Sequence, residues 1–364
     1  MIKSNVNCVL YCQSNSGHLQ LIYTGFEMLA RQNKINLTYK YGKSPINVFI
    51  EPSVDQLYVN YNGSHSMIFD TSDFGDISAE KLSQVDFYFK RSFSSEIIGS
   101  DYAYRKVFPL GLYYKVHGNP YNRNSLRRIF VQKPMKDALK TLIQEVFSPI
   151  LTFHPKLFLL HDSHCYSKPN FSLEPNVIFM VNLWDPDDTK AKYKEERYII
   201  NQMRVECVQK LNKEFGSRFR GGFLPNNYSR KLYPDFLTSN PRDFLFGNYM
   251  NILKNYSIGV ATTGLHKSIG WKFAEYIAFS KAIVSEILHY EAPGLVTGKH
   301  YSEFTTSDGC VEQVTRLMED KPLRDQMMID NHAYYCNYLS PDRLVWNALM
   351  IALEQQDASN LQKQ

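Results

Sequence analysis

The sequence predicts an α/β protein of two domains, each a sheet of mainly parallel strands covered by helices. Three observations lead to this prediction. The chain has 364 residues, which suits two domains of ordinary size better than one. It opens on an apolar run, a polar loop with one glycine and a helical pattern, between Val6 and Leu29. A strand–loop–helix–strand unit follows late in the chain, between Tyr256 and Val284.

The composition and charge of the chain exclude several classes of protein. The net charge of +5 is compatible with an anionic ligand or an anionic membrane surface, and is too small to indicate nucleic-acid binding. The six cysteines show no C-x-x-C spacing and indicate reduced thiols, not a disulfide framework or a zinc site. No apolar run reaches the ~20 residues of a membrane span. Since the N-terminus also lacks a signal-peptide pattern, we expect a cytoplasmic protein.

The first domain opens with a strand over Val6–Cys12, a loop and a helix from about Leu19, in the manner of a Rossmann-like domain. The loop lacks the G-x-G-x-x-G dinucleotide fingerprint. Further strands are predicted at 35–39, 48–50, 56–61, 67–70 and 85–92, and helices at 78–84 and 132–147. Because the early strands follow one another so closely, some antiparallel pairing is expected among them.

A proline-containing linker is predicted between about 150 and 175, so the domains are placed at 1–165 and 166–340. The second domain opens with a strong strand at 176–184 and a long helix at 195–215, which Gly216 caps. Another helix, at 244–254, leads into the late unit. A last helix and a polar tail occupy 341–364, with Val345, Leu349 and Leu353 on one face of the helix.

The late unit is the strongest candidate for a ligand site. Its loop, 262–270, contains Gly264 and Gly270 and lies at the carboxyl end of a strand, where open α/β sheets bind ligands. The loop leads into a helix whose first amides suit a phosphate. His266, Lys267 and Lys272 add positive charge there, and Glu275 lies just inside the helix.

The segment from Glu275 to Val284 (EYIAFSKAIV) resembles the "E-A-hydrophobic-A-x-G-x-P-V-V" pattern of GT-B-fold glycosyltransferases of the group 1, bacterial polysaccharide type. The resemblance implies two Rossmann-like domains facing a cleft, with a C-terminal helix crossing back to the first domain. It also implies a UDP- or GDP-sugar donor, no further cofactor, and a hydrogen bond from the ribose to Glu275. Many retaining members carry a second glutamate eight residues earlier, where this chain has Lys267.

Other residues are candidates for the proton transfer and for binding the diphosphate. Gly17-His18 is similar to a pair that supplies the catalytic base in some inverting members, and Asp70 or Asp73 is a candidate to orient His18. Transfer leaves a diphosphate, whose charge cationic side chains must stabilise where no metal is bound. Besides the cations of the 262–272 segment, the candidates are Arg218 and Arg220 in the second domain, and Lys90 and Arg91 at the end of a strand in the first.

The resemblance further implies an acceptor that is a glycan or a lipid-linked glycan of a bacterial surface. The charge and the many aromatic residues allow peripheral contact with the inner face of a membrane. Two alternatives remain open. Asp185 and Asp187 form a D-x-D pattern after a strand, as in metal-dependent GT-A transferases. The missing second glutamate is also compatible with a relative that binds nucleotide or glycan without turnover.

Overall fold

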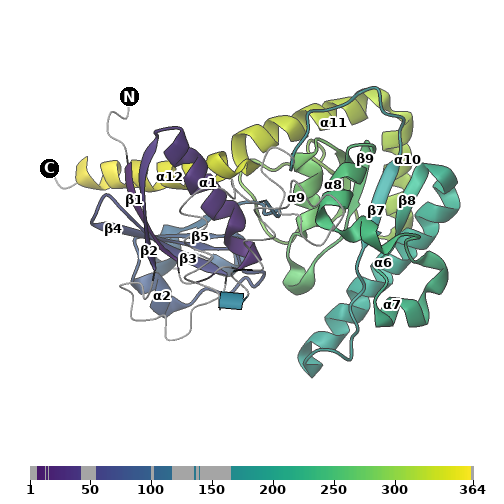
Figure 1. Cartoon of the computed structure of the whole chain (residues 1–364), viewed down its shortest axis with the longest axis horizontal. Coiled ribbons are helices and arrows are strands. Elements are labelled where there is room, and N and C mark those ends of the chain that lie inside the picture. Colours follow the sequence, from purple (N-terminus) through teal and green to yellow (C-terminus); the bar gives the residue numbers. More distant parts are fainter. Residues whose placement is uncertain are drawn as a thin grey trace. The chain divides into compact units, whose positions relative to one another are not determined.

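The computed structural model describes residues 6–41 apart from Gln13 and Asn15, then 55–99, 102–116, 135, 136, 139 and 165–361. The chain divides into two compact units (Figure 1). The first contains residues 1–151, 291–294 and 336–364, and the second contains 152–290 and 295–335. The predicted strand at 48–50, most of the predicted helix at 132–147 and the first part of the predicted linker lie outside the described residues.

The first unit contains a six-stranded sheet in the order β2-β1-β3-β4-β5-β6. Its strands are β1 (Val6–Cys12), β2 (Ile35–Tyr41), β3 (Gln56–Tyr61), β4 (His65–Asp70), β5 (Phe87–Lys90) and β6 (Val107–Pro109). Strand β3 runs antiparallel to β1 and β4, which confirms the antiparallel pairing expected from the closely spaced strands. The other neighbours are parallel, so β1, β4, β5 and β6 end at one edge of the sheet.

Helix α1 (Gln20–Arg31) packs against α12 (Pro341–Leu361) in this unit (Figure 1). Gly25 permits the close approach, because a Cβ there would lie 2.1 Å from the carbonyl oxygen of Pro341. The face of α12 that carries Val345, Leu349 and Ala352 is buried. The C-terminal helix therefore returns to the first unit, as predicted. Two short helices, α2 (Ala79–Ser83) and α3 (Ser95–Ile98), also belong to this unit.

The second unit is built on a fully parallel five-stranded sheet in the order β11-β10-β9-β7-β8. Its strands are β7 (Val177–Val181), β8 (Phe219–Phe223), β9 (Ile258–Ala261), β10 (Ala282–Glu286) and β11 (Ser302–Phe304). The chain steps from β7 to β8 on one side and then returns to the other side of β7 at β9. Such a reversal opens a crevice outside the carboxyl ends of the two strands, here β7 and β9.

Six helices accompany this sheet in the described residues: α6 (Lys194–Phe215), α7 (Asn227–Leu232), α8 (Phe246–Leu253), α9 (Trp271–Ala278), α10 (Ser307–Glu319) and α11 (Lys321–Tyr334). Helix α6 ends at Gly216 with φ 51°, as the sequence predicts. Buried residues of the five strands, α6, α10 and α11 form one hydrophobic core. Two α/β units on largely parallel sheets confirm the predicted fold class.

Candidate functional site

Arg204 joins the two strand ends that bound the crevice of the second sheet. Its guanidinium donates to the carbonyl of Asn182 after β7 (2.7 Å), and to the hydroxyl of Thr262 (3.0 Å) and the carbonyl of Thr263 (3.1 Å) after β9. The group also lies 4.1 Å from the ring centroid of Trp184. Burial lowers the pKa of Arg204 to about 9, a shift that Glu286 opposes. Arg204 is still protonated at neutral pH and places a fixed positive charge at the crevice.

The 262–270 loop is held by hydrogen bonds at several points. Glu286 accepts from the amide of Thr263 (2.7 Å), and Glu196 of α6 accepts from the amide of His266 (2.6 Å). The amide of Gly264 donates to the carbonyl of Ser268, and a Cβ at Gly264 would come within 2.5 Å of the Ser268 hydroxyl. His266 and Lys267 have φ of 58° and 59°, a conformation that costs energy for residues other than glycine. The loop is therefore built in one defined shape.

Helix α9 brings two of the predicted residues together. Lys272 Nζ lies 3.8 Å from the carboxylate of Glu275, one turn along the helix, and 3.5 Å from the ring centroid of Tyr249. Burial lowers the pKa of Lys272, and the charge of Arg204 lowers it further, whereas Glu275 opposes the shift. Glu275 is only 5% exposed. Lys272, Arg204 and Glu275 thus interact electrostatically beside the switch point. Gly270 is the N-cap residue of α9, and the Lys267 side chain is exposed.

The structure does not bring Arg218 and Arg220 to this loop. Arg218 ends the short helix η6 (Gly216–Arg218), which precedes β8, and Arg220 lies level with Ile178. Because β8, β7 and β9 are parallel, both arginines lie toward the amino-terminal edge of the sheet, whereas the loop lies at the opposite edge. Arg220 forms an ion pair with Asp243 (2.6 Å).

Asp185 and Asp187 form a turn. The carboxylate of Asp185 accepts from the amide of Asp187 (2.9 Å), and the exposed carboxylate of Asp187 pairs with Lys194 (2.7 Å). Within the described ranges, no three His, Cys, Asp or Glu side chains gather closely enough to hold a metal ion. Among the same residues, no helix is long and apolar enough to cross a membrane.

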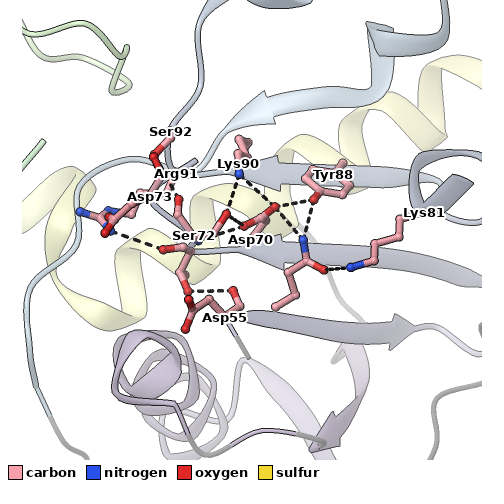
Figure 2. Close-up of polar contacts among 11 residues, drawn as sticks. Asp55, Asp70, Ser72, Asp73, Lys81, Tyr88, Lys90, Arg91 and Ser92 are labelled. Atoms are coloured by element: carbon pink, nitrogen blue, oxygen red, sulfur yellow. Dashed lines mark hydrogen bonds and ion pairs between the residues drawn. The ribbon is translucent and has the colours of Figure 1, made fainter. Parts of the chain in front are cut away.

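The first sheet carries a buried polar network at the carboxyl ends of β4 and β5 (Figure 2). Asp70 accepts from Lys90 (3.1 Å), from the Tyr88 hydroxyl (2.5 Å) and from Gln56 (2.8 Å) through one oxygen. Its other oxygen accepts from the amide and hydroxyl of Ser72. Lys90 is fully buried and Asp70 is 1% exposed. The polar atoms of both side chains are therefore used in contacts with each other and with neighbouring residues of this sheet edge.

A second chain of contacts at this edge leads to His18. Arg91 pairs with Asp73 (2.6 Å), and its guanidinium lies 5.7 Å from the ring centroid of Tyr113. Tyr113 stacks on His18 with 5.9 Å between ring centroids, and its hydroxyl donates to the carbonyl of Gly17. The structure thus connects Asp73 to His18 through Arg91 and Tyr113. Asp70 belongs to the separate network around Lys90.

Several residues of these sites were not found by sequence reasoning. Arg204 is one of many charged residues on a long helix, and no local pattern distinguishes it. Tyr88 and Tyr113 are two of 25 tyrosines. Trp184 could have been found, because it ends the strongest predicted strand. A residue at the carboxyl end of a parallel strand reaches the edge of the sheet where ligands bind.

Comparison with known proteins gives only distant matches. No protein-family model and no curated protein matches the chain. Among solved structures, the C-terminal domain of a group 1 glycosyl transferase (LpcC) from Francisella tularensis is 10% identical with a TM-score of 0.33, covering 49% of this chain and 96% of its own. HepE from Anabaena in complex with UDP is 10% identical with a TM-score of 0.35, covering 97% and 99%. The trehalose-6-phosphate synthase OtsA is 11% identical with a TM-score of 0.32, covering 79% and 75%.

Proposed function

We propose that this protein is a glycosyltransferase that takes a sugar from a nucleotide-sugar donor bound by its second unit. The observation that carries the proposal is the grouping of Arg204, Lys272 and Glu275 beside the crevice between β7 and β9. Open α/β sheets bind nucleotides at such switch points. Two cations and a carboxylate match the two polar parts of a nucleotide, its phosphates and its ribose hydroxyls.

In this proposal Lys272 and the fixed charge of Arg204 stabilise the diphosphate that departs during transfer. Cationic groups held in place before the reaction lower the barrier because they need not reorganise as charge develops. Glu275 accepts hydrogen bonds from the ribose. Gly264, His266, Lys267 and Gly270 shape the loop that receives the donor. Because the two cations can serve as counter-charge, we propose transfer without a metal ion.

We propose His18 as the general base that takes the proton of the acceptor hydroxyl. An imidazole titrates near neutral pH and suits this task. The contacts that support the proposal run from Asp73 through Arg91 and Tyr113, which hold the His18 ring from one side. The proposed acceptor is a glycan or a lipid-linked glycan of a bacterial surface, met at the inner face of the membrane. This acceptor class follows from the sequence resemblance alone.

The first test is a thermal-shift screen of the full chain with UDP, GDP, CMP and ADP and with their sugars, with and without Mn²⁺. A ligand at a hundred times its dissociation constant adds about 2.7 kcal/mol to the free energy of unfolding. We expect one nucleotide to shift the melting temperature without metal. Glu275→Ala and Lys272→Met are expected to abolish the shift. Lys254→Met, at an exposed lysine just after α8, is the matched control.

The outcomes separate the alternatives. A shift that requires Mn²⁺ and survives Glu275→Ala would favour a metal site at Asp185 and Asp187. Nucleotide binding without consumption of any donor sugar, with indifference to His18→Ala, would favour a binding protein without turnover. No shift with any nucleotide contradicts the proposed donor site.

A further inference from the structure

A cavity of about 600 Å³ lies in the second unit, and its lining includes none of Arg204, Lys272 and Glu275. Its walls are α6 between Glu196 and Glu206, the loop after β9, and the end of β10 with the segment that follows it. The volume lies within the ~300–1,000 Å³ typical of small-molecule sites. The cavity touches the proposed donor loop at Thr263, Gly264 and Lys267, so an occupant would lie next to the donor.

The lining combines an apolar surface with carboxylates. Ile199, Ile200 and Met203 supply the apolar part, and Ile199 remains 60% exposed although it is a large aliphatic residue. The carboxylates belong to Glu196, Glu206 and Glu286. Three glutamates against one lysine, Lys267, and one histidine, His289, disfavour a diphosphate in this space. Ionised carboxylates only accept hydrogen bonds, so a ligand here must donate them.

Each carboxylate already has a local donor. Glu196 accepts from the amide of His266, Glu286 from the amide of Thr263, and Glu206 from the side chains of Gln202 and Ser307. The charge of Glu286 is also attracted by Arg204. These contacts partly compensate the three negative charges, so a cationic ligand is not required to balance them. They also fix the oxygens as oriented acceptors, which suits hydroxyl donors.

We propose that this cavity binds a neutral, hydroxyl-rich carbohydrate of one to a few sugar rings. A pyranose presents C–H groups on its faces and hydroxyls at its edge, which matches an aliphatic surface flanked by carboxylates. The proposal that a carbohydrate binds here depends only on the cavity and its lining residues. Its role, as part of the glycan acceptor beside the donor loop, rests on the proposed function.

The test is saturation-transfer NMR on the full chain with maltotriose, lactose and diacetylchitobiose as neutral probes and spermidine as a cationic probe, followed by titration calorimetry. We expect at least one neutral probe to bind. Ile199→Lys, which changes an exposed residue of the lining, is expected to weaken binding by about tenfold or more, that is about 1.4 kcal/mol. The isosteric Glu206→Gln should weaken it as well. Gln209→Lys, at an exposed position on α6 outside the cavity, is the matched control and should bind as the parent does.

Three results would overturn the proposal: no neutral saccharide binds, saccharide binding is unaffected by both cavity variants, or spermidine alone binds and is lost in Glu206→Gln. The experiment also distinguishes this proposal from the proposed donor site. Saccharide binding that persists while no nucleotide binds would count against the donor site only. Nucleotide binding without saccharide binding would count against the cavity only.

Discussion

At the scale of single residues, buried charges are the most informative feature of this protein. A buried charge is costly unless partners compensate it, so its contacts indicate what the fold must preserve. Asp70 and Lys90 compensate each other inside the first unit. Arg204 is compensated by two carbonyls and a hydroxyl at the crevice of the second. Lys281, directly before β10, is 2% exposed, and burial lowers its pKa to about 7.

Asp70→Asn is expected to destabilise the first unit strongly. The change leaves the ammonium group of Lys90 buried without its counter-charge, which typically costs about 3–5 kcal/mol. The Asp70→Asn/Lys90→Met double variant should recover part of this loss. Urea unfolding monitored by circular dichroism measures both effects. Asp73→Asn is the comparison, because Asp73 is 34% exposed and its pair is better solvated. Equal losses in the free energy of unfolding for Asp70→Asn and Asp73→Asn would contradict this account.

Lys281 gives a prediction about pH. Its pKa is lowered in the folded protein, so between about pH 7 and pH 10.5 the unfolded chain binds a proton that the folded chain does not. The stability of the parent should therefore rise with pH through this window, by up to about 1.4 kcal/mol per pH unit from this group. The Lys281→Met variant lacks this pH-dependent contribution to the free energy of unfolding. We expect the variant to be more stable than the parent at pH 7, with the difference narrowing at pH 9.

Melting temperatures of both proteins at the two pH values provide the measurement. Lys254→Met controls for loss of an exposed lysine and should show no such convergence. A constant difference between Lys281→Met and the parent at the two pH values would show that Lys281 keeps an ordinary pKa in the folded protein.

The sequence could predict residues of the candidate site only where their neighbours are local. Lys272 and Glu275 were both named from the sequence as residues of one helix, and their spacing of three residues places the two side chains on one face of that helix. The link from Asp73 to His18 involves Tyr113, which lies 95 positions after His18, and no local spacing indicates it. Arg204 and Thr262 are likewise distant in sequence. Such contacts depend on how strands are ordered in the sheet.

At the scale of elements, the predictable parts are those with a strong local pattern. The unit from β9 to β10 was recognised because apolar strands flank a small-residue loop and an amphipathic helix. The return of the last helix to the first unit came from family resemblance. Its physical basis is visible only in the structure, where Gly25 of α1 meets the start of α12.

Gly25→Ala is expected to disturb the packing of α1 on α12. The added methyl group would meet the carbonyl of Pro341 and the side chain of Val345, and overpacking of this kind typically costs about 1–3 kcal/mol. Gly17→Ala is the matched control, since a Cβ at Gly17 has no heavy atom within 4 Å. Thermal unfolding should show a clear loss for Gly25→Ala alone. Similar melting temperatures for the two variants would mean that the helices separate at little cost.

At the scale of the whole molecule, the first unit is assembled from both ends of the described chain. Deleting residues 341–364 should therefore weaken the first unit and spare the second. The deletion uncovers the surface of α1 that Val345, Leu349 and Ala352 help to bury. Burial of one large aliphatic side chain stabilises the folded state by about 1.5–3 kcal/mol, and this stabilisation is lost. Hydrogen exchange followed by mass spectrometry should accelerate in α1 peptides and stay unchanged in α6 peptides. Faster exchange in both helices alike would contradict this division.

The pairing of α1 with α12 also has a consequence for biosynthesis. Domains usually fold in the order in which the ribosome makes them, the N-terminal one first. Here α1 is translated before every segment of the second unit, whereas its partner α12 is translated after all of them. The nascent first unit therefore has to keep an incomplete apolar surface in water until α12 has been made. We expect the second unit to mature first, and the newly made first unit to be the part of the chain that most needs chaperones.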